Sequence, residues 1–111
     1  MKVKTQNYNE VTVVELQGEL ESDSAELFRN TITDIIAKHR TGIVLDMSGV
    51  GFIDSSGLEQ LLWVRDCCSE NKCELRLAGL DENCAGILEI TRLAGEFDSY
   101  AELAQAVKSF V

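Results

Sequence analysis

The sequence reads IVLDMSGVGFIDSSGL over residues 43–58, and this stretch decides the fold. Residues 43–47 are a short apolar run bounded by turn residues, which is typical of a buried central strand. Residues 48–51 predict a loop, and residues 52–54 lead into a predicted helix from about Ser56 to Glu70. Polar residues therefore stand where a helix begins, beside backbone N–H groups that have no partner within the helix.

Two serines stand at the predicted start of this helix. Ser56 precedes Glu59 by three residues, a spacing that predicts a capping box and gives Ser56 a structural role. Ser55 falls one position outside the predicted helix, so its hydroxyl is free to face solvent or a partner. These roles predict that Ser56→Ala lowers stability more than Ser55→Ala does. The alternative is that both serines are only turn and cap residues.

Ser55 is a candidate phosphorylation site. A phosphate there would carry a charge of about −1.5 to −2 near the positive end of the helix dipole, so the fold should tolerate it. A partner docked on the same tip should not, because the charged and hydrated group would lose its water in the interface. Such a site changes the binding surface while the fold persists.

Further strands and helices alternate on both sides of this unit. Strands are predicted at residues 3–8, 11–16 and 74–78, with a fragment at 96–97, and Asn9-Glu10 predicts a hairpin turn. The strand at 74–78 alternates in a way that predicts one wet face. The order favours one α/β domain over residues 1–111, a mixed β-sheet of about four to five strands with about four helices packed on it.

The other helices are predicted from caps and apolar spacing. The first has Asp23 as its expected N-cap, with Glu26 three residues later. Its apolar stripe comprises Leu27, Phe28, Ile32, Ile35 and Ile36. A short helix is predicted over residues 82–91, and Ser99, followed by Glu102, is the expected cap of a C-terminal helix. That last helix carries the apolar residues Leu103, Ala106, Val107 and Phe110.

Charge and composition restrict the partners. The net charge of −9 disfavours nucleic-acid binding, which depends on clustered Lys and Arg, and favours a partner with a basic face. No stretch approaches the roughly 20 apolar residues that a membrane helix needs, so we expect no membrane insertion and a cytoplasmic location. The four cysteines lack zinc-ligand spacing and a disulfide framework, and we expect free thiols and no metal site.

The residues quoted above resemble those of the STAS domain, the family of anti-sigma factor antagonists and their relatives. The strand at residues 43–47 followed by DSSGL at residues 54–58 is similar to the family's strand, loop and D-S-[ST]-G-L motif. Residues 18–20, Gly-Glu-Leu, resemble the family's G-E-L-D segment, with Glu21 in place of the aspartate. Glu59 and Trp63 also depart from the family, which commonly has small residues at these positions.

The resemblance implies an anti-sigma factor antagonist that is not an enzyme. In such proteins the first serine after the aspartate, here Ser55, is phosphorylated by an anti-sigma factor that is also a serine kinase, and a phosphatase resets it. The unphosphorylated form binds the anti-sigma factor and releases the sigma factor. ATP and magnesium belong to the kinase, so no cofactor is expected. The expected partner-binding residues are Glu21, Asp23, Asp54, Ser55, Ser56, Gly57, Glu59 and Trp63.

Two alternatives stay open. One is a STAS module that does not switch, such as the cytoplasmic subunit of a phospholipid-transport complex or a signalling scaffold. The other is an enzyme, for which a serine nucleophile would need a base beside it, commonly a histidine. The only histidine, His39, stands between Lys38 and Arg40 near a predicted helix end, where a solvated cation is the ordinary role. Trp63 lies nearly opposite the predicted buried face and is interpreted either as part of a binding surface or as packed against a neighbouring loop.

Overall fold

A computed structural model describes residues 1–110 of the chain and shows one five-stranded mixed sheet. The strands are β1 (Lys2–Tyr8), β2 (Val11–Gln17), β3 (Gly42–Gly49), β4 (Glu74–Ala78) and β5 (Asp98–Tyr100). They lie in the order β1-β2-β3-β4-β5, with β1 antiparallel to β2 and every other pair parallel. The predicted hairpin is confirmed, and Asn9 takes the left-handed conformation, with φ 56°, that its tight turn requires. The predicted α/β class and mixed sheet are therefore confirmed.

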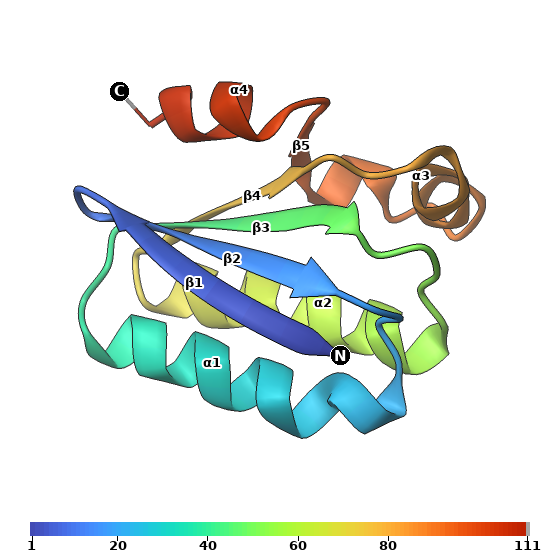
Figure 1. Cartoon of the computed structure of the whole chain (residues 1–111), viewed down its shortest axis with the longest axis horizontal. Helices are drawn as coiled ribbons and strands as arrows, with labels where there is room; N and C mark the ends of the chain where they lie inside the picture. The colour runs from blue at the N-terminus through green and yellow to red at the C-terminus, as the bar shows by residue number, and fades with distance from the viewer. Residues whose placement is uncertain (111) are drawn as a thin grey trace.

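The helices cover both faces of this sheet. They are α1 (Ala25–Ala37), α2 (Ser55–Glu70), α3 (Glu82–Ile90) and α4 (Leu103–Lys108), with short 3-10 turns η1 (Ser22–Ser24) and η2 (Ala94–Glu96). Figure 1 shows α1 and α2 side by side on one face, α4 on the other, and α3 beyond the end of the sheet. None of the helices in residues 1–110 has the length and apolar character needed to cross a membrane.

Strand β3 is buried on both faces, as its continuous apolar sequence predicts. Ile43, Leu45 and Met47 belong to the larger core, beneath α1 and α2, whereas Val44 belongs to a smaller core beneath α4. This division fixes the register of the strand, because a slip of one residue would move the side chains of each core into the other core.

The prediction that β4 has one wet face holds for Glu74, which is exposed, and is wrong for the rest of that face. The Ala78 side chain is buried beneath Ala106 and its neighbours in α4. The Arg76 side chain is only 13% exposed, and its guanidinium lies 4.4 Å from the centre of the Phe110 ring. An arginine can cover apolar surface with its stem and stack its head group on an aromatic ring, which explains why a charged residue stands on a covered face.

The predicted apolar stripe of α1 is confirmed except at one position. Phe28, Ile32 and Ile35 are buried and Ile36 is partly buried, but Leu27 is 44% exposed. Leu27 stands one residue before the centre of the stripe and therefore points about 100° away from it.

Two features of the C-terminal segment differ from the sequence prediction. Residues 96–97 are not a strand, because η2 ends at Glu96 and the last strand begins two residues later, at Asp98. Ser99 lies in β5 and does not cap α4, whose N-cap is Glu102. The predicted apolar face of α4 is confirmed, with Ala106 buried and Leu103, Val107 and Phe110 packed around it.

Candidate functional site

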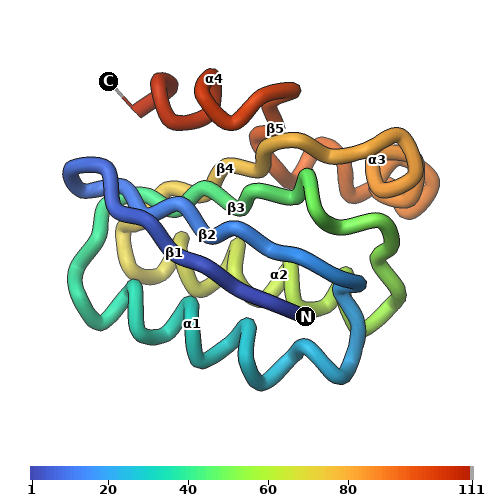
Figure 2. The backbone as a smooth tube through the Cα atoms, viewed as in Figure 1, coloured from blue at the N-terminus to red at the C-terminus, as the bar shows by residue number. Residues whose placement is uncertain are grey.

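Two loops meet at the edge of the sheet where β2 and β3 end. Leu20 and Ile53 form an isolated parallel bridge, the Leu20 N–H donates to the Phe52 carbonyl at 3.0 Å, and the Asp54 N–H donates to the Leu20 carbonyl at 3.2 Å. Figure 2 shows the two loops side by side, each leading into a helix below the sheet. This pairing brings residues 18–24 beside the start of α2, which carries the two candidate serines.

The first turn of α2 begins one residue earlier than the sequence predicts. Asp54 is the N-cap, and its Oδ1 accepts a hydrogen bond from the Gly57 N–H at 2.8 Å. Ser55 and Ser56 are the first two helical residues, so the predicted capping box of Ser56 with Glu59 is wrong. Aspartate and serine are comparably good N-caps, and three such residues in a row leave the choice to tertiary packing.

The stability of α2 should therefore depend on Asp54 rather than on Ser56. Asp54→Ala is expected to lower the free energy of unfolding by about 0.5–2 kcal/mol, whereas Ser55→Ala and Ser56→Ala should each change it by less than about 0.5 kcal/mol. Asp81 is a matched control, since its Oδ1 caps α3 by accepting from the Cys84 N–H at 2.7 Å, and Asp81→Ala should cost a similar amount. Denaturant melts provide the comparison, and a larger loss for Ser56→Ala than for Asp54→Ala would restore Ser56 as the cap.

The Ser55 side chain is exposed and the Ser56 side chain is half-buried. Within residues 1–110, neither hydroxyl has a hydrogen-bond partner, and the backbone N–H groups of both serines have no acceptor. These free N–H groups form the positive end of the α2 dipole. An anionic group on the Ser55 oxygen would therefore lie beside unpaired donors.

The loop that carries Glu21 and Asp23 is held against α2 by a buried glutamine. The Gln60 side chain is 3% exposed, its Nε2 donates to the Glu21 carbonyl at 2.7 Å, and its Oε1 accepts from the Ser24 hydroxyl at 3.4 Å. The single proton of the Ser24 hydroxyl is shared between this amide oxygen and the closer Glu21 carbonyl, at 2.7 Å, and the hydroxyl oxygen accepts from the Glu21 N–H at 3.1 Å. Sequence reasoning missed Gln60, because its partners lie 36 and 39 residues away.

The prediction that Asp23 is the N-cap of α1 is wrong. Asp23 lies in the middle of η1, whose own N-cap is Glu21, and α1 follows only at Ala25. The bonds between Ser24 and Glu21 close this extra turn, and the Ala25 N–H, which a cap at Asp23 could bond, donates to the Ser22 carbonyl instead. The Asp23 side chain is exposed as a result.

Acidic side chains gather around this tip. Partial burial, a hydrogen bond with Glu19 and the negative charges of Glu19, Asp23 and Asp54 together raise the pKa of Glu21. The raised pKa indicates that these carboxylates lie within electrostatic reach of one another and that the folded loop disfavours more negative charge. The structure therefore gathers Glu21, Asp23 and Asp54 at the tip that carries Ser55, and partner binding by these residues stays a prediction.

The remaining predicted residues extend the site along α2. Glu59 is exposed and lies one turn beyond Ser55 on the same side of the helix. Trp63 lies one turn further along α2 and is half-buried. It packs against α1, where the Arg29 guanidinium lies 5.5 Å from the centre of its ring. Its neighbour is therefore a helix, which corrects the interpretation that it packs against a loop, whereas its place on a binding surface stays a prediction. Phe52, which sequence reasoning did not single out, is 43% exposed in the loop just before Asp54.

Gly57 has a packing role that explains a glycine in the first turn of the helix. A Cβ atom at this position would lie 2.2 Å from the Leu20 carbonyl oxygen and 2.9 Å from the Ile53 Cγ2. Only a residue without a side chain allows α2 to start this close to the neighbouring loop. Gly57 therefore fixes the distance between Ser55 and the acidic loop.

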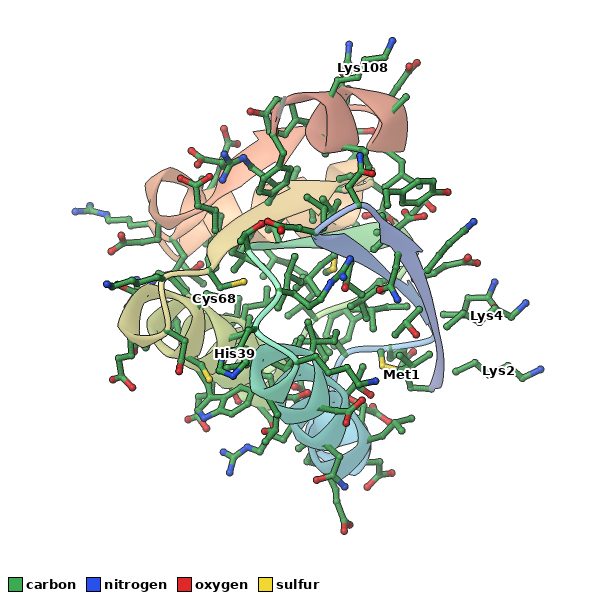
Figure 3. The ribbon with its side chains drawn as sticks, turned by 90° about the vertical axis from the view of Figure 1, so that its left-hand side faces the viewer. Met1, Lys2, Lys4, His39, Cys68 and Lys108 are labelled. Carbon is green, nitrogen blue, oxygen red and sulfur yellow. The ribbon has the colours of Figure 1, made fainter. Side chains whose placement is uncertain are left out.

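His39 lies far from this tip along the fold. It follows the C-terminus of α1 (Figure 3), at the end of the sheet where β3 begins. Ser55 instead follows the loop after the opposite end of β3. Asp54, the carboxylate next to Ser55 in the sequence, accepts a hydrogen bond from the Gly57 N–H as the cap of α2.

A family model of the STAS domain matches residues 2–106, and the chain belongs to this family. An anti-sigma factor antagonist from Mycobacterium paratuberculosis is 21% identical, with a TM-score of 0.86 over 97% of this chain and 92% of that one. The anti-sigma factor antagonist SpoIIAA in its unphosphorylated form is 20% identical, with a TM-score of 0.82 over 98% of this chain and 96% of that one. SpoIIAA of Bacillus in its phosphorylated form has a TM-score of 0.76 at 20% identity, over 99% of this chain and 100% of that one.

The same fold also occurs in a transporter family protein. A sulfate transporter family protein from Wolinella succinogenes is 21% identical, with a TM-score of 0.81 over 92% of this chain and 85% of that one. Identities this low establish a common fold and leave the function to the residues at the tip.

Proposed function

We propose that this protein is an anti-sigma factor antagonist, a binding switch that regulates transcription and is controlled by phosphorylation of Ser55. The observation that carries the proposal is an exposed serine in the first turn of a helix whose start is rigidly packed, beside free backbone N–H groups. Membership of the STAS family and the likeness to antagonists, one of them solved in a phosphorylated form, support it.

The unphosphorylated tip binds an anti-sigma factor kinase and thereby releases a sigma factor. Its docking surface comprises Glu21, Asp23, Asp54, Ser55, Ser56, Glu59 and Trp63, which lie on the two paired loops and along α2, whereas Gly57 is buried and supports this surface from beneath. The acidic side chains of this set suit a kinase face rich in Lys and Arg, because complementary charge speeds encounter and fixes orientation. The kinase then phosphorylates Ser55, and a phosphatase removes the phosphate. The place of action is the cytoplasm, where sigma factors work.

The protein acts by binding rather than by catalysis. A serine nucleophile needs a base within hydrogen-bond reach, and His39 lies at the opposite edge of the sheet. The Asp54 carboxylate is engaged as a helix cap. ATP and its magnesium come with the kinase, and the antagonist needs no cofactor of its own.

Labelling with ATP tests the choice of serine. Incubation with anti-sigma factor kinases of the host and radiolabelled ATP should label the wild-type protein and Ser56→Ala, and should leave Ser55→Ala unlabelled. Since neither serine is a cap, both variants should stay folded, and melting curves provide the control. Label retained on Ser55→Ala would contradict the assignment of this residue.

A second candidate is a STAS module that does not switch, which the likeness to a transporter family protein favours. The same experiment separates the two functions. The switch requires label on Ser55 and a phosphopeptide containing Ser55 in protein purified from its own host. Absence of both, together with co-purification of a membrane transport complex, would replace the switch with the second candidate.

A further inference from the structure

The C-terminus of α2 ends in a tight turn that places two cysteines together. Asn71 is the C-cap, Lys72 takes the left-handed conformation with φ 56°, and the Cys73 N–H donates to the Cys68 carbonyl at 2.9 Å. This is the long bond of a Schellman motif, in which the side chain following the left-handed residue contacts the side chain three positions inside the helix end. Those two contact positions are Cys73 and Cys68.

The end of α3 has the same motif with ordinary residues. Arg92 takes the left-handed conformation with φ 64°, and the Leu93 N–H donates to the Leu88 carbonyl at 2.8 Å. The two contact positions there are leucines, as the motif needs only an apolar pair. The thiols at the end of α2 therefore add a chemistry that the turn itself does not require.

The backbone geometry brings Cys68 and Cys73 within disulfide range. An amide nitrogen lies about 1.5 Å from its own Cα, and a carbonyl oxygen lies about 2.4 Å from its own. A bond of 2.9 Å between them therefore keeps the two Cα atoms within about 7 Å, the limit for a disulfide without backbone movement. A hydrogen bond with Cys73, followed by burial, raises the pKa of Cys68, in keeping with the short distance that the backbone bond imposes on the two residues.

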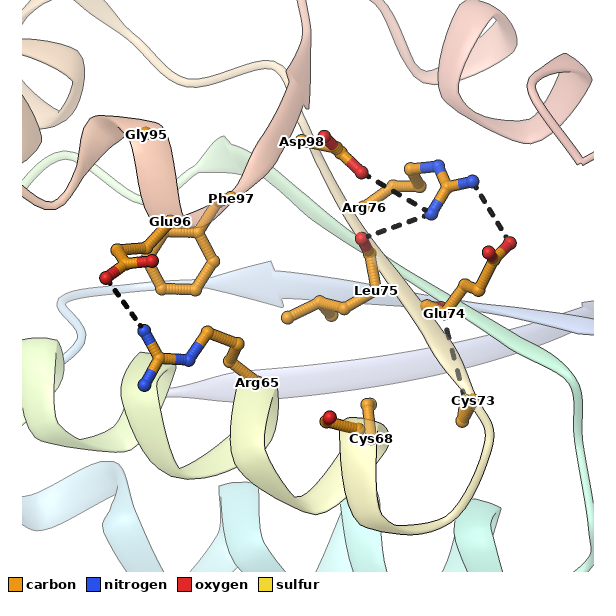
Figure 4. Close-up of a pocket in the computed structure, with 11 residues that line it drawn as sticks. Arg65, Cys68, Cys73, Glu74, Leu75, Arg76, Gly95, Glu96, Phe97 and Asp98 are labelled. Atoms are coloured by element: carbon orange, nitrogen blue, oxygen red, sulfur yellow. Dashed lines mark hydrogen bonds and ion pairs between the residues drawn. The ribbon is translucent and has the colours of Figure 1, made fainter.

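A groove gives small reagents access to this pair. Cys68 is 1% exposed and Cys73 is 6% exposed, but both line a groove of about 300 Å³ between the end of α2 and strands β4 and β5. Arg65 and Arg76 extend along its walls, held by ion pairs to Glu96 and Asp98 (Figure 4). Cys67, the adjacent cysteine, is half-buried and does not line the groove.

We propose that Cys68 and Cys73 are a redox-active dithiol that forms a reversible intramolecular disulfide by exchange with a small-molecule disulfide such as oxidised glutathione. The Cys73 thiol loses its proton and attacks one glutathione sulfur, which forms a mixed disulfide and releases the first glutathione as a thiol. The Cys68 thiol then loses its proton and attacks the Cys73 sulfur, which releases the second glutathione. Two protein thiols are oxidised, and one glutathione disulfide is reduced to two glutathione molecules.

Cys73 is the residue that reacts first with glutathione, for two reasons. It is the more exposed of the pair, and the last turn of α2 disfavours a thiolate at Cys68, because the negative end of the helix dipole lies there. The disulfide would join α2 to the start of β4 at the end of the helix opposite Ser55, so the inference is independent of the proposed switch.

The test uses the folded full-length protein and oxidised glutathione. After incubation, the protein is unfolded and alkylated with N-ethylmaleimide, and its intact mass is measured. We expect two of the four cysteines to escape alkylation, a mass lower by two hydrogen atoms before alkylation, and one peptide linking Cys68 to Cys73. Dithiothreitol should restore alkylation of all four.

Single substitutions sharpen the result. Cys68→Ser should stop the reaction at a mixed disulfide with one glutathione on Cys73, whereas the matched control Cys67→Ser should form the intramolecular disulfide as the wild type does. A linkage through Cys67 or Cys84 would overturn the proposal, as would glutathione on Cys67 with the Cys68 and Cys73 thiols still free. A Cys68–Cys73 linkage that forms only in denaturant would also overturn the proposal. Peptide mapping of the wild-type protein identifies the linked cysteines even if Cys68→Ser does not fold.

Discussion

Phosphorylation of Ser55 is expected to weaken binding of the partner kinase by about 100-fold or more while the domain stays folded. The fold should persist because the phosphate lies at an exposed position beside the free N–H groups of Ser55 and Ser56. A negative group at an exposed helix N-terminus is stabilising by roughly 0.3–1 kcal/mol. Repulsion from Asp54 and Glu21 opposes this gain, so the melting temperature should change little in either direction.

Binding should respond much more strongly than stability. In the docked state the phosphate would lose its water next to carboxylates that already raise the pKa of Glu21. An uncompensated charge buried in an interface costs about 3–5 kcal/mol, and each 1.4 kcal/mol is tenfold in the dissociation constant. Ser55→Asp should reproduce the effect only in part, since aspartate carries one charge and has fewer acceptor oxygens than phosphate.

Calorimetric titration of the kinase with the unmodified, phosphorylated and Ser55→Asp forms measures this effect, and circular dichroism and melting curves report the fold. Ser69→Asp is the matched control, because it places the same charge on an exposed residue near the other end of α2. Its affinity should stay within about twofold of wild type. Equal weakening by Ser69→Asp would point to net charge rather than to the tip, and an unfolded phosphoprotein would refute the switch.

The central strand, loop and helix could be predicted because their signals are local. The apolar run at residues 43–47 and the polar residues after it decide where β3 ends and α2 begins, to within one or two residues. The layout of alternating strands and helices follows from the same kind of pattern. The exposed, unpaired Ser55 was predicted correctly, although for the wrong reason, since the capping role that was assigned to Ser56 belongs to Asp54.

The details of the site depend on contacts between distant segments, which no local pattern contains. The Leu20 carbonyl accepts a hydrogen bond from Asp54 and leaves no room for a side chain at position 57. These two contacts accompany an N-cap at Asp54, two residues before the Ser56 cap that the sequence predicts. Gln60 reads in the sequence as an ordinary polar helical residue, and only the fold shows it buried beneath the loop that carries Glu21. Asp23 was misplaced for a similar reason, because an extra 3-10 turn precedes α1.

Gly57→Ala is expected to lower the free energy of unfolding by roughly 1–3 kcal/mol. Intrinsic helix propensity predicts the opposite, a gain of about 1 kcal/mol for alanine over glycine within a helix. Packing should prevail, because the new Cβ would lie 2.2 Å from the Leu20 carbonyl oxygen, a backbone atom that cannot rotate away. Overpacking costs about 1–3 kcal/mol, and moving the loop also breaks the hydrogen bond from the Asp54 N–H to Leu20, worth about 0.5–1.5 kcal/mol.

Gly86→Ala is the matched control for this prediction. Gly86 also lies within a helix, α3, but a Cβ atom there would meet nothing within 4 Å. It should therefore show the propensity gain alone, about 0.5–1 kcal/mol of added stability. Denaturant melts of the two variants should move in opposite directions, and the melting temperature of Gly57→Ala should fall by about 10 °C. If Gly57→Ala were as stable as wild type, the two loops would not be packed as tightly as the structure shows, and the link between Ser55 and the acidic loop would fail with it.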